Sequence, residues 1–270
     1  MRNRTIKILE LLASNEKIKV KLLAEMLDVS LVTLRKDLDN LEKRGIISRI
    51  HGYASLSGAN NTGKRLAISY SIKRRIASAA VQIVDEGETI MLESGSCCAM
   101  FAEELAINNK NVSIITNSVF ITDYVCKLPN IKLILLGGAF QPESQVLVGP
   151  ITKKCAGELF SDKFFIGTDG FIPGYGFTGR DHLRVETAQE MAKNTKKVFI
   201  LTESTKFNRR GACSLIQFNK ITGVFTDDSI PKEAEATLLK QSIALHKVSS
   251  TDEEIKWCKF PGQPPFLYTV

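Results

Sequence analysis

The sequence predicts two unequal parts: a small winged helix-turn-helix domain, then an α/β domain with a largely parallel sheet. Three observations predict this fold class. The chain has 270 residues, enough for one to two domains. Its first quarter shows helical periodicity interrupted by short polar turns and ends in two short strands. From residue 88 onward, short apolar runs alternate with helical stretches, which is typical of a parallel sheet covered by helices.

The composition excludes several classes of protein. Hydrophobic residues make up 44% and charged residues 24% of the chain, and the mean hydropathy of −0.02 is that of a globular protein, not a disordered or fibrous one. No apolar run approaches the ~20 residues of a membrane span, and the start of the chain is charged, so we expect a cytoplasmic protein without membrane partners. The six cysteines form no CxxC pair, so free thiols and no metal or cofactor are expected.

The positive charge is concentrated at the start of the chain. The formal net charge is +7, and residues 1–75 hold 16 Lys and Arg against 7 Asp and Glu. The remaining residues hold 20 basic and 22 acidic side chains. This distribution favours an N-terminal module that neutralises phosphates. Charge alone leaves a solvated basic face as the alternative.

The first quarter shows the pattern of a helix-turn-helix. Apolar periodicity predicts helices over residues 4–14 and 20–27, a turn at residues 28–30, and a third helix that Ser30 caps with its hydroxyl. We expect the exposed first turns of the third helix to contact DNA through donor-rich side chains, with Arg35 and Lys36 foremost. Asp37 is expected to brace a neighbouring arginine. The candidate contacts are Ser30, Val32, Thr33, Arg35 and Lys36.

Two short strands complete the module. Gly45 is placed as a helix C-cap, and residues 46–50 and 53–56 read as strands around His51 and Gly52. Arg49 and His51 would then be wing residues that reach the DNA backbone or minor groove. The alternative is a three-helix domain that binds protein.

Residues 22–54 resemble the winged helix-turn-helix of the DeoR family of bacterial transcriptional regulators. The resemblance rests on Thr33-Leu34-Arg35-Lys36-Asp37-Leu38 followed by Arg49-Ile50-His51-Gly52. It implies a DNA-binding regulator. Tyr53 departs from the family, which usually has a second glycine there.

The small polar residues after the second strand predict a linker. We place the DNA-binding domain at residues 1–57, the linker at 58–70, the α/β domain at 71–250 and a tail at 251–270. A basic amphipathic helix is expected over residues 64–84 with Lys73, Arg74 and Arg75 exposed. The aromatic residues of the tail either dock on the protein or fray.

The second part alternates strand and helix. Strands are predicted at residues 89–92, 112–116, 132–136, 163–166, 197–201 and 221–226, and helices at 97–107, 118–127, 150–160, 184–195 and 231–242. Ligands of such folds bind outside the carboxyl ends of the strands.

The residues that follow these strands share a chemistry. Glycines and small hydroxyl residues at helix N-termini can receive an anion, Lys206 supplies a positive charge, and Glu93, Asn117 and Asp169 can bind the hydroxyls of a sugar or polyol. Each loop alone is equally an ordinary turn cap, and Arg180 is either a second anion contact or a surface residue. The candidate effector-binding residues are Glu93, Ser94, Gly95, Ser96, Thr116, Asn117, Ser118, Gly138, Gly167, Thr168, Asp169, Gly170, Arg180 and Lys206.

This half resembles the sensor domain of the DeoR family, which is similar in fold to ribose-5-phosphate isomerase and CoA transferases. The resemblance rests on residues 90–96, 115–118, 136–138, 165–170, 176–178 and 204–207. It implies a phosphorylated sugar or polyol effector that controls DNA affinity, in a repressor of a catabolic operon. Glu93 and Glu203 stand where the family commonly has Asp, and Ala188 where it often has Lys.

The leading hypothesis is therefore a transcriptional regulator that binds operator DNA as a dimer or tetramer, not an enzyme. The alternative is a phosphosugar isomerase or transferase with a basic appendage, in which Glu93, Asp169, Glu186 or Glu203 acts as general acid or base. Position 188 lacks the lysine expected beside an isomerase pocket. A scaffold that binds only protein does not explain the phosphate-type loops.

Overall fold

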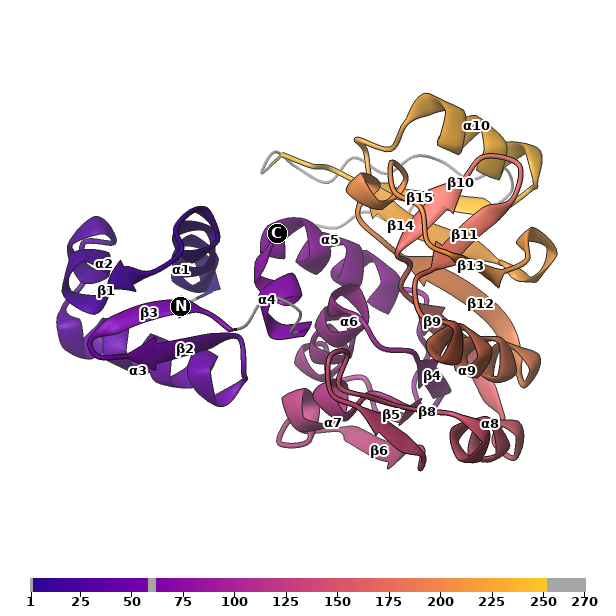
Figure 1. The fold of residues 1–270 in the computed structure, drawn as a ribbon, viewed down its shortest axis with the longest axis horizontal. Helices are drawn as coiled ribbons and strands as arrows, with labels where there is room; N and C mark the ends of the chain where they lie inside the picture. Colours follow the sequence, from indigo (N-terminus) through magenta and orange to yellow (C-terminus); the bar gives the residue numbers. More distant parts are fainter. Residues whose placement is uncertain (1, 58–61, 252–270) are drawn as a thin grey trace.

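The computed structural model describes residues 2–57 and 62–251, so almost all of the predicted tail lies outside the described residues. A small domain and a larger α/β domain lie side by side (Figure 1). The small domain consists of α1 (Arg2–Ser14), β1 (Ile18–Lys19), α2 (Val20–Met26), α3 (Leu31–Lys43), β2 (Ile47–Ile50) and β3 (Tyr53–Leu56). It is the predicted winged helix-turn-helix.

Local signals set the elements of the small domain. The Ser30 hydroxyl accepts a hydrogen bond from the Thr33 amide at 3.2 Å, which confirms the predicted N-cap of α3. The β2–β3 hairpin turns at His51 and Gly52, both with positive φ (50° and 80°), as a tight two-residue turn requires. Strand β1 pairs with β3 and was not predicted, because two residues carry no periodicity.

The larger domain is built on a seven-stranded parallel sheet in the order β15-β14-β12-β9-β4-β5-β6. The strands are β4 (Thr89–Leu92), β5 (Val112–Thr116), β6 (Ile131–Leu135), β9 (Ser161–Ile166), β12 (Thr195–Leu201), β14 (Gly223–Asp227) and β15 (Ala244–Val248). The helices are α4 (Thr62–Ala67), α5 (Tyr70–Val81), α6 (Ser96–Ile107), α7 (Val119–Val125), α8 (Pro150–Gly157), α9 (His182–Lys193) and α10 (Lys232–Lys240). The predicted parallel sheet is confirmed, with β15 as a strand that was not predicted.

Both faces of the sheet are buried. Phe164 and Phe165 are neighbours on β9, yet Phe165 packs with α5 and α6 and Phe164 with residues of α8 and α9. Alternate residues of a strand point to opposite faces, so the central strands are apolar at almost every position. Short antiparallel elements lie outside this sheet: β7 (Ala139–Gln141) with β8 (Val146–Val148), and β10 (Gly170–Ile172), β11 (Gly176–Gly179) and β13 (Cys213–Ile216).

Lys73 corrects one expectation from the sequence. Its side chain is only 2% exposed, although the helical pattern placed it on the solvent face. Its ammonium lies 2.9 Å from a Glu203 carboxylate oxygen and donates to the carbonyls of Arg65, at 2.7 Å, and Ile68. A buried cation needs such partners. Lys73 therefore ties the end of α4 to the loop after β12.

Candidate functional site

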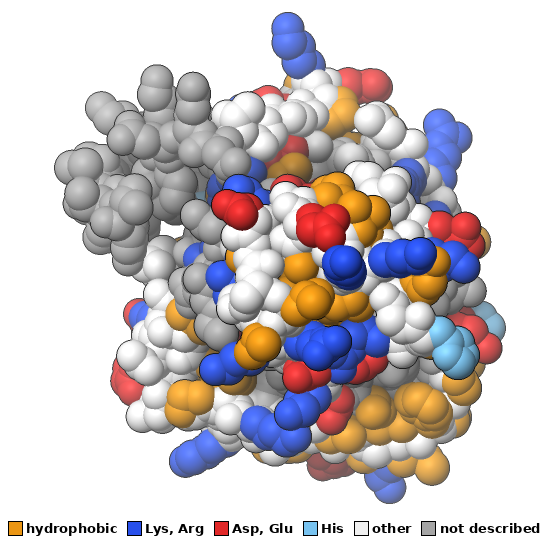
Figure 2. Space-filling model, turned by 90° about the vertical axis from the view of Figure 1, so that its left-hand side faces the viewer, with side chains coloured by type: hydrophobic (Ala, Val, Ile, Leu, Met, Phe, Trp, Pro, Cys, Tyr) orange, Lys and Arg blue, Asp and Glu red, His pale blue; other side chains and the backbone are white. Residues whose placement is uncertain are grey.

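The exposed surface of α3 carries most of the predicted DNA contacts. Ser30, Arg35 and Lys36 are exposed and Val32 is 77% exposed, while Thr33 is half-buried with its hydroxyl 2.9 Å from that of Ser30. Basic side chains are spread over the face of the molecule on the winged-helix side (Figure 2). This arrangement offers donors and an apolar methyl surface to a DNA groove.

Asp37 lies on the buried side of the same helix. Its carboxylate is 4% exposed and pairs with the Arg4 guanidinium of α1, which confirms that it braces an arginine. The contact holds α1 against α3 and raises the pKa of Arg4, chiefly through the hydrogen bond. Asp37 is therefore a structural residue of the DNA-binding domain.

The two predicted wing contacts differ in their surroundings. His51 is exposed at the tip of the hairpin. Arg49 instead contacts two acidic residues of α3, Asp39 at 2.5 Å and Glu42 at 2.6 Å. The hydrogen bond between Arg49 and Glu42 is the main cause of the raised pKa of Arg49 and of the lowered pKa of Glu42. Arg49 thus joins the wing to α3 in this structure.

Tyr53, the departure from the family pattern, gathers positive charge at the wing. The ammonium groups of Lys17 and Lys19 lie 5.3 Å and 5.8 Å from the centre of its ring. Both distances are within the range of cation–π contacts. A second glycine at this position would not hold those lysines.

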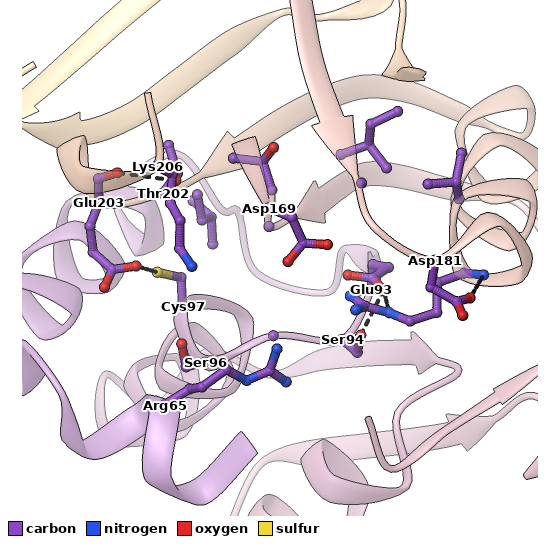
Figure 3. Close-up of a pocket in the computed structure, with 18 residues that line it drawn as sticks. Arg65, Glu93, Ser94, Ser96, Cys97, Asp169, Asp181, Thr202, Glu203 and Lys206 are labelled. Carbon is purple, nitrogen blue, oxygen red and sulfur yellow. Dashed lines mark hydrogen bonds and ion pairs between the residues drawn. The ribbon is translucent and has the colours of Figure 1, made fainter. Parts of the chain in front are cut away.

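A pocket lies at the carboxyl ends of β4, β9 and β12 in the larger domain (Figure 3). It is where parallel α/β sheets bind ligands. Predicted candidates from three loops line it: Glu93, Ser94, Gly95, Ser96, Gly167, Thr168, Asp169 and Lys206. Its other lining residues include Arg65, Cys97, Asp181, Arg184, Thr202 and Glu203.

One side of the pocket is suited to an anion. Helix α6 begins here after Gly95, whose φ of 137° only glycine adopts readily, and its first turn carries Ser96 and Cys97. The free amides of a helix N-terminus and its dipole attract negative charge. Arg65 and Lys206 also line the pocket, and Figure 3 shows both side chains directed into it.

The Arg65 and Lys206 side chains are half-buried. Burial is the main cause of the lowered pKa of Lys206. Burial and then the charge of Arg184 lower the pKa of Arg65. The Arg65 Nε atom is buried with no hydrogen-bond partner among the described residues. An anion bound between these cations would restore the interactions that they lost with water.

The pocket carboxylates differ in how far they are already engaged. Glu93 accepts from Arg184 at 3.0 Å and from the Ser94 hydroxyl at 2.6 Å, and its charge is the main cause of the raised pKa of Arg184. Glu203 pairs with Lys73 and lies 3.6 Å from the Cys97 sulfur. Asp169 accepts only a backbone amide, that of Arg180 at 3.0 Å, among the described residues. Its carboxylate is therefore the one most available to a ligand hydroxyl.

Predicted candidates from the neighbouring loops have roles within the protein. The Thr116 hydroxyl accepts from the Ser118 amide at 3.1 Å, and Ser118 caps α7 through the Ile121 amide. Asn117 donates to the Leu147 carbonyl at 3.1 Å. Strand β5 lies one strand beyond β4, away from the pocket. These residues lie outside the pocket lining, and a ligand role for them stays a prediction.

Three further candidates also lie outside the lining. An added Cβ at Gly138 would lie 1.8 Å from the Thr152 hydroxyl, and one at Gly170 would lie 2.4 Å from the Arg209 carbonyl, so close packing explains both glycines. Arg180 is exposed, and its backbone amide is the group that contacts Asp169. Of the two alternatives for Arg180, an anion contact or a surface residue, its exposure favours the surface residue.

Arg65 and Arg184 are pocket residues that sequence reasoning missed. Arg65 lies on α4, inside the range assigned to the linker, and no pattern links it to strands that follow much later in the chain. Arg184 lies in the first turn of α9, whose N-cap Asp181 accepts from the Arg184 amide at 2.9 Å. The Asp181 cap signal could have marked that helix start.

No group of His, Cys, Asp and Glu in the described part of the chain could hold a metal ion. The cysteines among those residues are free thiols. Over the same ranges, no helix combines the length and apolar character that a membrane crossing needs.

A winged helix joined to an α/β domain with a cationic pocket defines the class of transcription regulators that carry a ligand-sensing domain. Two family models match the chain: a DeoR-like helix-turn-helix domain over residues 4–58 and a DeoR C-terminal sensor domain over residues 68–228. The protein belongs to the DeoR family.

Curated relatives match over most of their length. The HTH-type transcriptional regulator GolR of Listeria innocua is 31% identical, over 85% of this chain and 91% of its own. The glycerol-3-phosphate regulon repressor of Escherichia coli is 25% identical, over 88% and 95%. The L-fucose operon activator of Haemophilus influenzae is 26% identical, over 83% and 91%.

Solved structures give more distant matches. Ribose 5-phosphate isomerase A of Methanocaldococcus jannaschii is 19% identical, with a TM-score of 0.39, over 52% of this chain and 55% of its own. A translation initiation factor eIF-2B of Pyrococcus horikoshii is 15% identical, with a TM-score of 0.42, over 82% and 87%.

Proposed function

We propose that this regulator binds operator DNA through the exposed face of α3 and the wing, and responds to a phosphorylated sugar or polyol bound in the pocket. The effector is linked to DNA binding by its different affinity for the two states of the protein. We further propose that it represses a sugar or polyol catabolic operon. The relatives named as repressors support this sign of control.

The proposal rests on one observation: within the described chain, two cations that line the pocket have no acidic partner. Arg65 and Lys206 have no carboxylate at ion-pair distance among the described residues, although Arg184 and Lys73 are each paired. Two half-buried cations without a carboxylate partner in this part of the chain, beside a helix N-terminus, favour an anionic ligand. Asp169 across the pocket can accept from a ligand hydroxyl (Figure 3). A phosphate on one end and hydroxyls on the other meet both requirements.

The test is a fluorescence-anisotropy titration on DNA from upstream of the gene and its neighbours, at two salt concentrations. The probes are glycerol 3-phosphate, glucose 6-phosphate, fructose 1-phosphate and galactose 6-phosphate, each beside its unphosphorylated counterpart and inorganic phosphate. Specific binding that weakens with salt and responds to one phosphate, but not to its counterpart, supports the proposal. Specific binding without a response to any phosphate would reject the effector class.

The enzyme hypothesis is the second candidate, and the pairing of the carboxylates argues against it. A general base must be free to take a proton from its substrate. Glu93 and Glu203 are engaged by Arg184 and Lys73, and Glu186 pairs with Lys153 outside the pocket lining. Asp169 is the one candidate base in the pocket without an ion-pair partner among the described residues, and position 188 holds a buried alanine instead of the expected lysine. We propose binding without turnover. Isomerisation of any phosphate in the panel, followed by NMR, would reverse that conclusion.

We also propose a homo-oligomer, a dimer or tetramer, because one winged helix reads few base pairs. Its candidate contact is an apolar patch around the free edge strand β6: Ile134, Leu135, Phe140 and Ile151, which are 43%, 40%, 53% and 65% exposed. An exposed apolar edge strand that pairs with its own copy is covered in both copies at once. Sedimentation velocity of the wild type and of F140D/I151D tests it: a monomeric wild type, or an unchanged assembly in the variant, rejects it.

A further inference from the structure

Helix α4 contacts the pocket and the DNA-binding domain at the same time. Arg65 on this short helix lines the pocket, and Leu66 is fully buried in the apolar cluster that α6 also enters. Gly63 packs against the turn that follows α3: an added Cβ there would lie 2.2 Å from the Gly45 carbonyl oxygen. A displacement of Arg65 toward a ligand therefore moves a backbone that is in contact with the DNA-binding domain.

Helix α6 makes a second connection. It begins in the pocket at Ser96, and Glu103 near its other end binds Arg44, which caps the C-terminus of α3. The Arg44 Nη2 atom lies 2.7 Å from the Glu103 carboxylate, and its guanidinium stacks 4.5 Å from the Tyr124 ring centre. The Tyr124 hydroxyl donates to the same carboxylate at 2.6 Å. We call Arg44, Glu103 and Tyr124 the interdomain latch.

Around the latch, the contact between the two domains carries charged side chains beside the shared apolar core. A cavity there is lined by residues of α1, α3 and its C-cap, α5 and α6: Thr5, Asp37, Asn40, Leu41, Arg44, Tyr70, Arg74, Glu103, Glu104 and Ile107. A charged, half-buried pair of this kind contributes little net stability, because each charge gives up water when it forms. Contacts with a small free-energy difference between their closed and open states are the ones that a ligand can shift.

We propose that the latch and the Gly63–Gly45 contact transmit pocket occupancy to the placement of the recognition helix. An anion that binds Arg65 and the start of α6 displaces α4 and α6 together, and the latch opens. This inference rests on the proposed function. Arg44, Glu103 and Gly63 act as positioning residues, because they contact neither the pocket nor the exposed face of α3.

The test compares E103Q, R44Q and the charge-reversed double variant R44E/E103R with the wild type. Glutamine at position 103 keeps the size of the side chain and its bond to Tyr124 but removes the charge. K247Q is the control, because Lys247 pairs with Glu235 at 2.7 Å within the larger domain. The probe is the panel phosphate that gives the largest wild-type response. Two quantities are measured: its affinity for the free protein by calorimetry, and the ratio of operator Kd with and without it.

In the wild type and K247Q we expect the ratio to lie in the range of about 5- to 150-fold that is typical of such coupling. In E103Q and R44Q it falls toward 1, whereas calorimetry still shows binding of the phosphate. R44E/E103R recovers at least part of the ratio. Wild-type ratios in E103Q and R44Q would overturn the latch alone. A wild type that ignores every phosphate would overturn the proposed function, and the latch with it.

Discussion

Replacement of Lys73 by methionine tests whether the buried ion pair behind the pocket holds the larger domain together. The Lys73 side chain is 2% exposed, and its ammonium contacts Glu203 and two backbone carbonyls at the end of α4. Methionine fills nearly the same volume but cannot donate. The change isolates the loss of charge from the loss of packing.

The expected loss of unfolding free energy in K73M comes from the Glu203 carboxylate, which would stay buried without its partner. The Glu203 side chain is 9% exposed, and K73M leaves its charge without the cation. Removal of one partner from a buried pair costs about 3 to 5 kcal/mol of unfolding free energy. In a domain of this size that corresponds to a fall in Tm of about 10 °C. K73M/E203Q removes the stranded charge, so we expect it to lose less than K73M alone.

The assay is urea unfolding followed by circular dichroism at pH 7. K247M is the matched control: its pair with Glu235 is 23% and 29% exposed, and we expect a loss of at most about 1 kcal/mol. A K73M loss no larger than that of K247M would refute the reasoning. A double variant that loses as much as the sum of K73M and E203Q would refute it as well, because the two side chains would then be uncoupled.

Three further predictions concern DNA, effector and pH. R35A should weaken operator binding about 10- to 100-fold, as loss of a base contact does, with effector affinity unchanged by calorimetry; wild-type operator affinity would remove α3 from the interface. R65Q and K206Q should each lower effector affinity about 10- to 100-fold with operator binding kept, since each loses a charged hydrogen bond; a normal response would place the site elsewhere. Burial lowers the pKa of His246 to about 4, so the folded protein resists its protonation. The contribution of His246 to the free energy of unfolding is therefore fully present above the ordinary histidine pKa of ~6.5. It falls by about 2 kcal/mol between pH 7 and pH 5. H246Q should remove that part of the slope in urea unfolding at the two pH values, and an equal slope in both proteins would contradict the prediction.

The regular elements could be predicted because each carries its own periodicity or cap. The hydroxyl of Ser30, the apolar positions of α3 and the continuous apolar runs of β4, β9 and β12 are local signals, and the structure confirms the elements that they predict. The pairs β7–β8 and β10–β11 are three or four residues long, too short to show alternation. Lys73 was misplaced because helical spacing cannot show that α4 and the loop after β12 cover an apparent solvent face.

The pocket was predicted in part for a physical reason. Residues that directly follow central strands of a parallel sheet meet at one edge, so Ser94, Asp169 and Lys206 could be grouped. The loop after β5 also follows a strand of the sheet, so the same rule grouped its residues with the pocket. Which loops are neighbours depends on the order of the strands in the sheet, and the sequence does not show that order. Arg65 comes from outside the sheet altogether: it lies on α4, at the start of the helix expected over residues 64–84 and within the range assigned to the linker.

The continuity of the apolar core has a consequence for hybrid regulators. A single cluster runs from Ile8 and Leu34 in the winged helix through Leu66 and Ala67 of α4 to the strands of the larger domain. A fusion joined at residue 57 would separate the winged helix from α4, against which it packs. Apolar side chains of α4 would then be exposed on the sensor domain. A cut after α4 would keep this surface with the winged helix, but it would take Arg65 away from the pocket of the sensor. Helix α4 therefore belongs to both domains, and a hybrid regulator has to match it to both.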